Sequence, residues 1–326
     1  MPGLKFSAWL IHSRPESLAS FKAHAGLMAR VYPVWYLTGP AGQPIRRPDA
    51  TPALRTRVLG VAQDHGLQVW PLISNHNAAL GDFDPALMRL VMGDPSTRRA
   101  HIAQLLDFVR ADGAQGVDLD YENLYDADRD AFSGFVAELA AAFRAAGLKV
   151  GIAVHAKTDE PGTPGGSRAQ DYTALAAACD RLQIMGYDYH WSTGPAGPIG
   201  PPDWCGAVLD HALALAPPAR IEWGVPGYGN NWGGDAPAVG VHWDDWQALV
   251  DAHPPGRRDP ATAELTLRYA GREVWMNDAI SITAKLWQMR RRGVSEAAMW
   301  VLGAEDPRLW ALIETLPADF LPVEEP

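Results

Sequence analysis

Short β-rich runs alternate with amphipathic helical stretches along almost the whole chain, and this alternation restricts the fold more than any other feature. Eight runs have the residue content of strands: Leu4–Ile11, Val31–Leu37, Gln68–Ser74, Gly116–Tyr121, Lys149–His155, Arg181–Tyr187, Arg220–Val225 and Ala298–Leu302. Helical patterns between them include Ser96–Asp112, Asp128–Ala146, Ala169–Ala178, Trp204–Leu215 and Ala279–Arg292. Strand, helix and strand in succession are typical of parallel βαβ units.

The number of strand-like runs favours a closed barrel over an open doubly wound sheet. Eight parallel strands separated by helices form a (β/α)₈ TIM barrel, and a chain of 326 residues can build one as a single domain. The rival dinucleotide-binding fold would carry Gly-x-Gly-x-x-Gly after an early strand, and no such motif is present there. We therefore predict an α/β protein with one barrel over residues 1–316 and a short tail at 317–326.

One segment is too long to be a simple connection within such a barrel. It spans about residues 228–278, between the seventh and eighth predicted strands. A helical pattern lies near Trp243–Ala252, and two strand patterns, Glu264–Tyr269 and Glu273–Asn277, flank a turn at Ala270-Gly271-Arg272. We predict a small α+β insertion that forms one wall of a cleft.

Composition and charge exclude several classes of partner. Hydrophobic residues make up 47% of the chain and charged residues 20%, which is enough for a large core. The net charge of −10 argues against nucleic acid, because phosphate binding needs an excess of Lys and Arg. Cys179 and Cys205 give no disulfide framework and no metal-binding spacing. We expect no metal, no cofactor, no nucleic-acid partner and a monomeric protein.

The sequence also lacks the usual signals for membrane insertion and export. No stretch approaches the length of a transmembrane helix. The apolar patch in Met1–Ser13 is short and is interrupted by Ser7 and His12, unlike the core of a secretory signal. We expect no membrane partner and, for the chain as written, a cytoplasmic location, with action at a cell wall or outside the cell left open.

Three acidic residues, Asp118, Asp120 and Glu122, are spaced two apart at the end of the fourth predicted strand. Alternate side chains of a strand share a face, so the three carboxyl groups point the same way. Like charges that converge inside a barrel raise at least one pKa, which keeps a carboxylic acid protonated for general-acid catalysis. Glu122 is closest to the C-terminal strand end, where barrels of this type place catalytic groups.

Two other interpretations of these acids are a solvent-exposed acidic strand and a site for a divalent metal ion. A central strand of a parallel sheet is covered on both faces, which argues against exposure. No histidine joins the acids within the same strand, although a metal site built from carboxylates stays open as an alternative. We favour catalysis over both.

The segment Gly116–Glu122 resembles the signature of glycoside hydrolase family 18, Asp-Gly-x-Asp-x-Asp-x-Glu. Gln115 stands where the first Asp usually lies. Similar matches follow at the sixth, seventh and eighth predicted strands: Gln183–Tyr189, Trp223–Gly229 and Met299–Gly303. Further features resemble the bacterial branch with spore-cortex-lytic and spore-germination enzymes: Val69–Asn75, Glu122-Asn123, Tyr187–Trp191, Gly197-Pro198-Ile199 and Trp300–Asp306.

The resemblance implies a retaining, substrate-assisted mechanism in which the 2-acetamido oxygen of the sugar attacks the anomeric carbon. It implies that Glu122 protonates the glycosidic oxygen and then activates water. Asp120 would orient the acetamido N–H and stabilise the positive intermediate, and Asp118 would share a proton with Asp120. Tyr187 would hold the acetamido carbonyl, and Asp188 would contact the same sugar.

Thirteen tryptophans are a high number, and several lie near predicted strand ends. Sugar rings stack on indoles, so a tryptophan-lined cleft suits a glycan, although most single tryptophans fill the core. We predict Trp300 as the floor under the bound sugar. Further candidates for substrate binding are Trp35, Tyr228 and Asn75. Two histidines at strand ends are predicted to be structural: His155 and His190.

The predicted function is cleavage of β-1,4 linkages in glycans that contain N-acetylglucosamine, of the peptidoglycan or chitin type, with protein-linked glycans as a further possibility. The alternative is a lectin-like barrel that binds carbohydrate without cleaving it. Non-catalytic members of the family usually lack the final Glu of the signature, whereas Glu122 is present here. A metal-dependent hydrolase that uses the same carboxylates is the second alternative.

Overall fold

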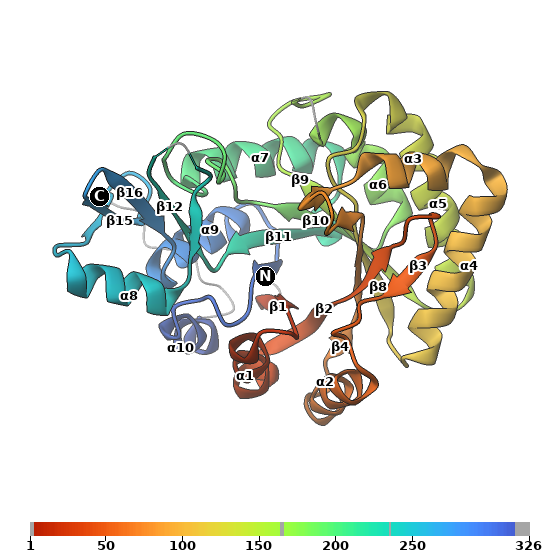
Figure 1. Ribbon diagram of the computed structural model, residues 1–326, viewed down its shortest axis with the longest axis horizontal. Coiled ribbons are helices and arrows are strands. Elements are labelled where there is room, and N and C mark those ends of the chain that lie inside the picture. Colours follow the sequence, from red (N-terminus) through yellow and green to blue (C-terminus); the bar gives the residue numbers. More distant parts are fainter. Residues whose placement is uncertain (1–2, 164–165, 235, 317–326) are drawn as a thin grey trace.

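Residues 3–163, 166–234 and 236–316 are described by the computed structural model, and in them eight parallel strands close into a barrel (Figure 1). The barrel strands are β1 (Lys5–Leu10), β2 (Met28–Thr38), β5 (Leu72–Ser74), β8 (Gly116–Asp120), β9 (Lys149–His155), β10 (Arg181–Met185), β11 (Ile221–Pro226) and β17 (Glu296–Trp300). Each pairs with the next, and β17 pairs back with β1. The predicted (β/α)₈ barrel is confirmed, and the predicted tail at 317–326 lies outside the described residues.

Helices surround the barrel and connect its strands (Figure 1). They are α1 (Pro15–His24), α2 (Pro52–His65), α3 (Pro85–Gly93), α4 (Pro95–Ala111), α5 (Arg129–Ala145), α6 (Tyr172–Ala178), α7 (Pro202–Leu215), α9 (Ala279–Arg290) and α10 (Arg308–Thr315). In α5, Phe132, Phe135, Val136 and Leu139 recur at helical spacing and are buried, so one face packs inward. None of the helices in the described part combines the length and the apolar character needed to cross a membrane.

Some predicted strands end at different residues in the structure. The third is split into β4 (Gln68–Val69) and β5, because Pro71 has no N–H to donate between strands. The sixth ends at Met185 rather than Tyr187. The eighth starts at Glu296, two residues before the predicted start. The prediction missed this start because the first residue of the strand is an acid, which is buried inside the protein.

The insertion between β11 and α9 is a small α+β unit beside the barrel (Figure 1). Its elements are β12 (Gly229–Trp232), β13 (Val239–Val241), α8 (Trp243–Ala252), β14 (Arg257–Arg258), β15 (Leu265–Tyr269) and β16 (Arg272–Met276). The strands form an antiparallel sheet in the order β13-β12-β16-β15-β14. The predicted hairpin is present as β15 and β16, and positive φ angles at Ala270 and Gly271 make its tight turn. The predicted α+β insertion is present, but none of its described residues lines the cavity at the C-terminal end of the barrel, so its role as one wall of a cleft stays a prediction.

A buried ionic cluster fills the N-terminal end of the barrel. Arg30 of β2 contacts both Glu222 of β11 and Glu296 of β17, and Arg181 of β10 forms a two-point ion pair with Glu296. The hydroxyl of Tyr32 donates to Glu222. Each buried carboxylate therefore has a hydrogen-bonded partner at this end of the barrel.

Candidate active site

Strand β8 carries Asp118 and Asp120 towards the C-terminal end of the barrel, and Glu122 follows two residues after Asp120. Asp118 is completely buried, Asp120 is nearly so, and the side chain of Glu122 is 15% exposed. The indole N–H of Trp9 donates to Asp118 over 2.8 Å. The predicted ladder of acids therefore runs from the closed interior to a group that solvent and substrate can reach.

The backbone of Glu122 is held from both sides by Asn75. The Glu122 N–H donates to the Asn75 side-chain oxygen over 2.9 Å, and the Asn75 amide donates to the Glu122 carbonyl over the same distance. Asn75 is completely buried and does not line the cavity. The prediction that Asn75 binds substrate is therefore wrong; it is a positioning residue for the acid, because both its donor and its acceptor are used on the backbone.

Burial and mutual repulsion shift the pKa of each acid on this ladder upward. Burial, and then the charge of Asp120, raise the pKa of Glu122 well above its usual range. Burial raises the pKa of Asp120 to about 6, against an opposing hydrogen bond from Glu122. The pKa of Asp118 is raised well above normal by burial, although the Trp9 bond opposes this. Near neutral pH, Glu122 is thus a protonated acid that donates to an ionised Asp120.

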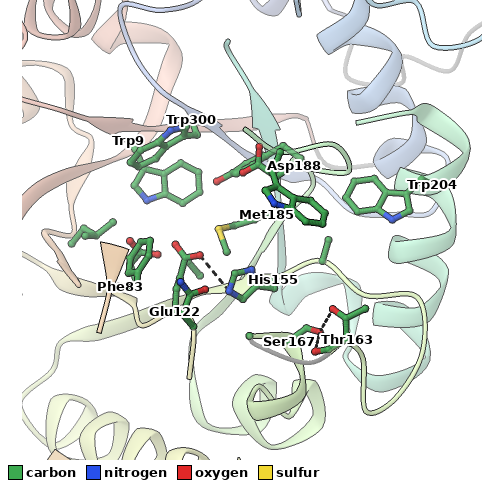
Figure 2. A pocket seen from close by; sticks show the side chains of 18 residues that line it. Trp9, Phe83, Glu122, His155, Thr163, Ser167, Met185, Asp188, Trp204 and Trp300 are labelled. Carbon is green, nitrogen blue, oxygen red and sulfur yellow. Dashed lines mark hydrogen bonds and ion pairs between the residues drawn. The ribbon is translucent and has the colours of Figure 1, made fainter. Parts of the chain in front are cut away.

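A cavity of about 590 Å³ opens where the acids end, and Figure 2 shows the side chains around it. Five residues singled out from the sequence line it: Asp120, Glu122, Tyr187, Asp188 and Trp300. They come from the ends of three barrel strands, β8, β10 and β17. This is the location at which barrels of this fold place their catalytic groups.

The segment after β10 contributes two of these groups. Tyr187 is almost completely buried, and burial raises the pKa of its hydroxyl well above normal, so the hydroxyl remains a proton donor. Asp188 follows with a positive φ of 58°, which turns the chain out of the strand direction. The hydroxyl of Tyr228 donates to Asp188. Tyr228 is not among the residues that line the cavity, and its contact with substrate stays a prediction.

Two indoles lie together on another side of the cavity. Trp300 ends β17, and its ring centre lies 6.0 Å from that of Trp9 (Figure 2). Trp9 also lines the cavity, which the sequence did not single out, although its position near the end of the first predicted strand could have identified it. Of the further lining residues, Met185 lies in a segment quoted for the family resemblance. Phe83 and Trp204 gave no signal in the sequence.

Trp35 does not bind substrate in this structure. Its side chain is completely buried in the cluster that also contains Val58 and Leu105 of the surrounding helices. A register shift in the pairing of β2 with β5 occurs between Val34 and Tyr36, directly around Trp35. The prediction for Trp35 is wrong because alternation along the strand decides which side chains face the cavity. The register shift interrupts this alternation at Trp35, and its side chain faces the core.

The two histidines have different surroundings. His190 is structural as predicted, with one ring nitrogen 3.0 Å from the Pro195 carbonyl. His155, the last residue of β9, lines the cavity, and its Nε2 lies 3.3 Å from Oε2 of Glu122. The prediction that His155 is only structural is wrong, because β9 is the neighbour of β8 and their ends meet at the same edge of the sheet.

Gln115 takes over a backbone contact at the start of the signature. Its side-chain oxygen accepts from the Val69 N–H over 2.9 Å, and its amide donates to the Gly113 carbonyl over 2.9 Å. The contact with Val69 joins the residue before β8 to strand β4. Gln115 therefore lies at the start of β8, at the opposite end of the strand from Glu122.

Within residues 3–163, 166–234 and 236–316, no group of three or more histidine, cysteine or acidic side chains has the geometry of a metal site. Asp118 and Asp120 lie on β8, and Glu122 follows two residues after the end of the strand.

Comparison with known proteins places this geometry in a family. Residues 57–300 match the model of glycosyl hydrolases family 18. The chain belongs to this family. It is a glycoside hydrolase, and the catalytic strand, the Tyr187 segment and Trp300 all lie within the matched region.

The chain is also similar to several individual proteins that are described as glycosylases, lytic enzymes or chitinases. The chain is 23% identical to the uncharacterized glycosylase YvbX of Bacillus subtilis, over 79% of this chain and 77% of that protein. It is 26% identical to the cortical fragment-lytic enzyme of Bacillus subtilis, over 79% of this chain but only 62% of that protein. Among solved structures, a chitinase from Chromobacterium violaceum has a TM-score of 0.88 at 26% identity, over 95% of this chain and 98% of that chain.

Proposed function

We propose that this glycoside hydrolase cleaves β-1,4 linkages next to N-acetylglucosamine by substrate-assisted catalysis, with Glu122 as the general acid. The observation that carries the proposal is the position of Glu122, which lines the cavity beside Asp120 and whose pKa is raised by burial and by the charge of that neighbour. An acid with this pKa donates its proton to the departing glycosidic oxygen and, as the carboxylate, then activates water. A lectin-like barrel would have no use for an acid tuned in this way.

The neighbouring groups suit an acetamido sugar. Asp120 is the ionised member of the ladder, so it can accept from the acetamido N–H and stabilise the positive charge that develops when the acetamido oxygen attacks the anomeric carbon. The protonated hydroxyl of Tyr187 can donate to the acetamido carbonyl. Asp118, raised in pKa below Asp120, can share a proton with it. In this mechanism the nucleophile comes from the substrate.

The charge of the cavity favours a neutral stretch of glycan. Three carboxyl groups line it, from Asp120, Glu122 and Asp188, and the described lining residues include no lysine or arginine. A sugar with a free carboxylate, such as muramic acid, would meet like charge without a compensating cation. N-acetylglucosamine is uncharged, so we propose that chitin-type oligomers and neutral stretches of cell-wall glycan bind better than acidic ones.

Digestion assays with defined substrates test both parts of the proposal. Chitin oligosaccharides, a high-mannose glycoprotein, and peptidoglycan fragments with free or methyl-esterified carboxyl groups are incubated with wild type and Glu122→Gln, and the products are identified by mass spectrometry. We expect wild type to release N-acetylglucosamine-containing products, with esterified fragments cut faster than free acids. Glu122→Gln should lower kcat by about 10²- to 10⁴-fold while substrate still binds.

The outcomes separate the alternatives. Binding of chitin oligosaccharides by wild type without release of any product would support the lectin-like alternative. Full activity in Glu122→Gln would show that another group is the acid. Faster cleavage of the free-acid fragments than of the esters would contradict the proposed charge preference and leave the assignment of Glu122 intact.

A further inference from the structure

A histidine with no role in the proposed mechanism lies beside the general acid. Nε2 of His155 is 3.3 Å from Oε2 of Glu122, and the interaction is drawn in Figure 2. This nitrogen is inaccessible to solvent and makes no hydrogen bond of correct geometry to any group among the described residues, Glu122 included. A buried polar atom is costly to leave unpaired, and Glu122 lies close enough for a small rotation of either side chain to give this nitrogen a hydrogen bond.

The backbone on which His155 sits is fixed to the catalytic strand. The His155 N–H donates to the side-chain oxygen of Gln170 over 2.7 Å, and the Gln170 amide donates to the carbonyl of Tyr121 over 3.3 Å. The hydroxyl of Tyr172 donates to the His155 carbonyl over 2.6 Å. The buried side chain of Gln170 therefore connects the backbone of Tyr121, the residue before Glu122, to the backbone of His155. This connection fixes the distance between the side chains of Glu122 and His155.

The backbone of Gly166 lies close to the imidazole of His155. A Cβ atom at Gly166 would lie 2.8 Å from Nε2 of His155 and 2.9 Å from its Cδ2. Such contacts are too short for carbon, so any larger residue at this position would push the ring away from Glu122. The close approach of the Gly166 backbone thus holds the ring in place without competing for its nitrogen.

The imidazole is neutral in this environment. Burial lowers the pKa of His155 to about 4, so the ring carries one proton at neutral pH. The groups that act on Glu122 from the packed elements are Asp120 of β8, Asp82 of β7 (Asp82–Phe83) and Asp188 after β10. All three are acidic, and none of them can donate a hydrogen bond to a Glu122 carboxylate when ionised.

We propose, on the basis of the function proposed above, that His155 is a positioning residue whose Nε2–H donates to Oε2 of Glu122 and stabilises the carboxylate left after proton transfer. In that step the Glu122 proton moves to the glycosidic oxygen, which leaves with the electron pair of the broken bond to the anomeric carbon. The bond from the acetamido oxygen to that carbon forms at the same time. His155 keeps its own proton throughout and holds the carboxylate ready to activate water.

Substitution of His155 tests the donor role directly. His155→Ala removes the donor, whereas His155→Gln places an amide N–H at a similar distance from the backbone. His65→Gln, on the exposed end of α2, is the matched control. We expect kcat to fall by about 10- to 100-fold in His155→Ala. In His155→Gln, kcat should be close to that of wild type, because the amide replaces the donor. The control should behave as wild type.

The pKa of Glu122 gives a second readout that needs no activity. Carboxyl ¹³C NMR titrations of wild type, His155→Ala and His155→Gln, with Glu122→Gln to assign the signal, should show a higher Glu122 pKa only in His155→Ala, because the carboxylate has lost a donor. Equal pKa values in all three proteins would overturn the proposal, as would equal losses of kcat in Ala and Gln. A lower pKa in His155→Ala would also overturn it, by showing that Nε2 accepts a proton from Glu122. Inactive wild-type protein with the expected titration would refute only the proposed function.

Discussion

Buried carboxyl groups lie at both ends of the barrel interior, but their pKa values are shifted in opposite directions at the two ends. At the N-terminal end, burial would raise the pKa of Glu296, yet hydrogen bonds and charge from Arg181 and Arg30 outweigh it and lower that pKa. At the C-terminal end, no cation from the described residues acts on Asp120 or Glu122, and both pKa values are raised. The same residue type is structural where an arginine accompanies it and available for catalysis where none does.

The same difference predicts how substitutions at each end affect stability and activity. The ionic cluster joins β2, β10, β11 and β17, so it fastens strands that are far apart in sequence. The acids on and after β8 make fewer links to other strands: Trp9 of β1 donates to Asp118, and His155 of β9 lies beside Glu122. Substitution at the first end should therefore cost stability, and substitution at the second should cost activity.

Removal of the central cation should have the largest effect. Arg30→Met leaves Glu222 and Glu296 buried with one partner fewer, and we expect the free energy of unfolding to fall by about 3 to 5 kcal/mol. Urea denaturation measures it. Lys5→Met is the control, because Lys5 pairs with the same Glu296 but is 56% exposed, and its loss should cost less than about 1 kcal/mol. Equal effects of the two substitutions would remove the proposed contrast.

At the other end, Asp120→Asn should act mainly on catalysis. An amide cannot supply the negative charge that stabilises the positive intermediate, so kcat should fall by about 10²- to 10³-fold. Stability at neutral pH should be equal to or above that of wild type, since a buried, poorly compensated charge is removed. Kinetics on a chitin oligosaccharide and urea denaturation of the same preparation measure both. A variant that is less stable than wild type but has a normal kcat would show that Asp120 is needed for folding and not for catalysis.

The two ends should also respond to pH with opposite sign. Because the folded-state pKa of Asp120 is about 6, above its ordinary value of 3.8, the folded protein binds more protons than the unfolded chain between these values. This group therefore destabilises the fold as pH rises from about 4 to 6, by on the order of 2 to 3 kcal/mol. Glu296, with its lowered pKa, loses its stabilising effect as pH falls. Asp120→Asn should flatten the decline in stability between pH 4 and 7, and an unchanged decline would contradict the raised pKa.

Much of the site was predictable from sequence because it depends on local geometry. Residues two apart on a strand share a face whatever the rest of the fold does, so their spacing alone aligns Asp118, Asp120 and Glu122. The hairpin of the insertion was equally local, because its turn needs two residues with positive φ between strand patterns. The strand pattern failed at Glu296, where an acid starts a strand because an arginine from another strand pairs with it.

The sequence by itself determined the acid ladder, the barrel and the insertion, since each follows from periodicity along the chain. Only the tertiary structure decided what surrounds Glu122. Asn75 became a backbone clamp, His155 a partner of the acid, Trp9 a lining residue and Trp35 a core residue. These outcomes depend on strand register and on contacts between segments distant in sequence, and a shift of one residue turns a side chain from the cavity into the core.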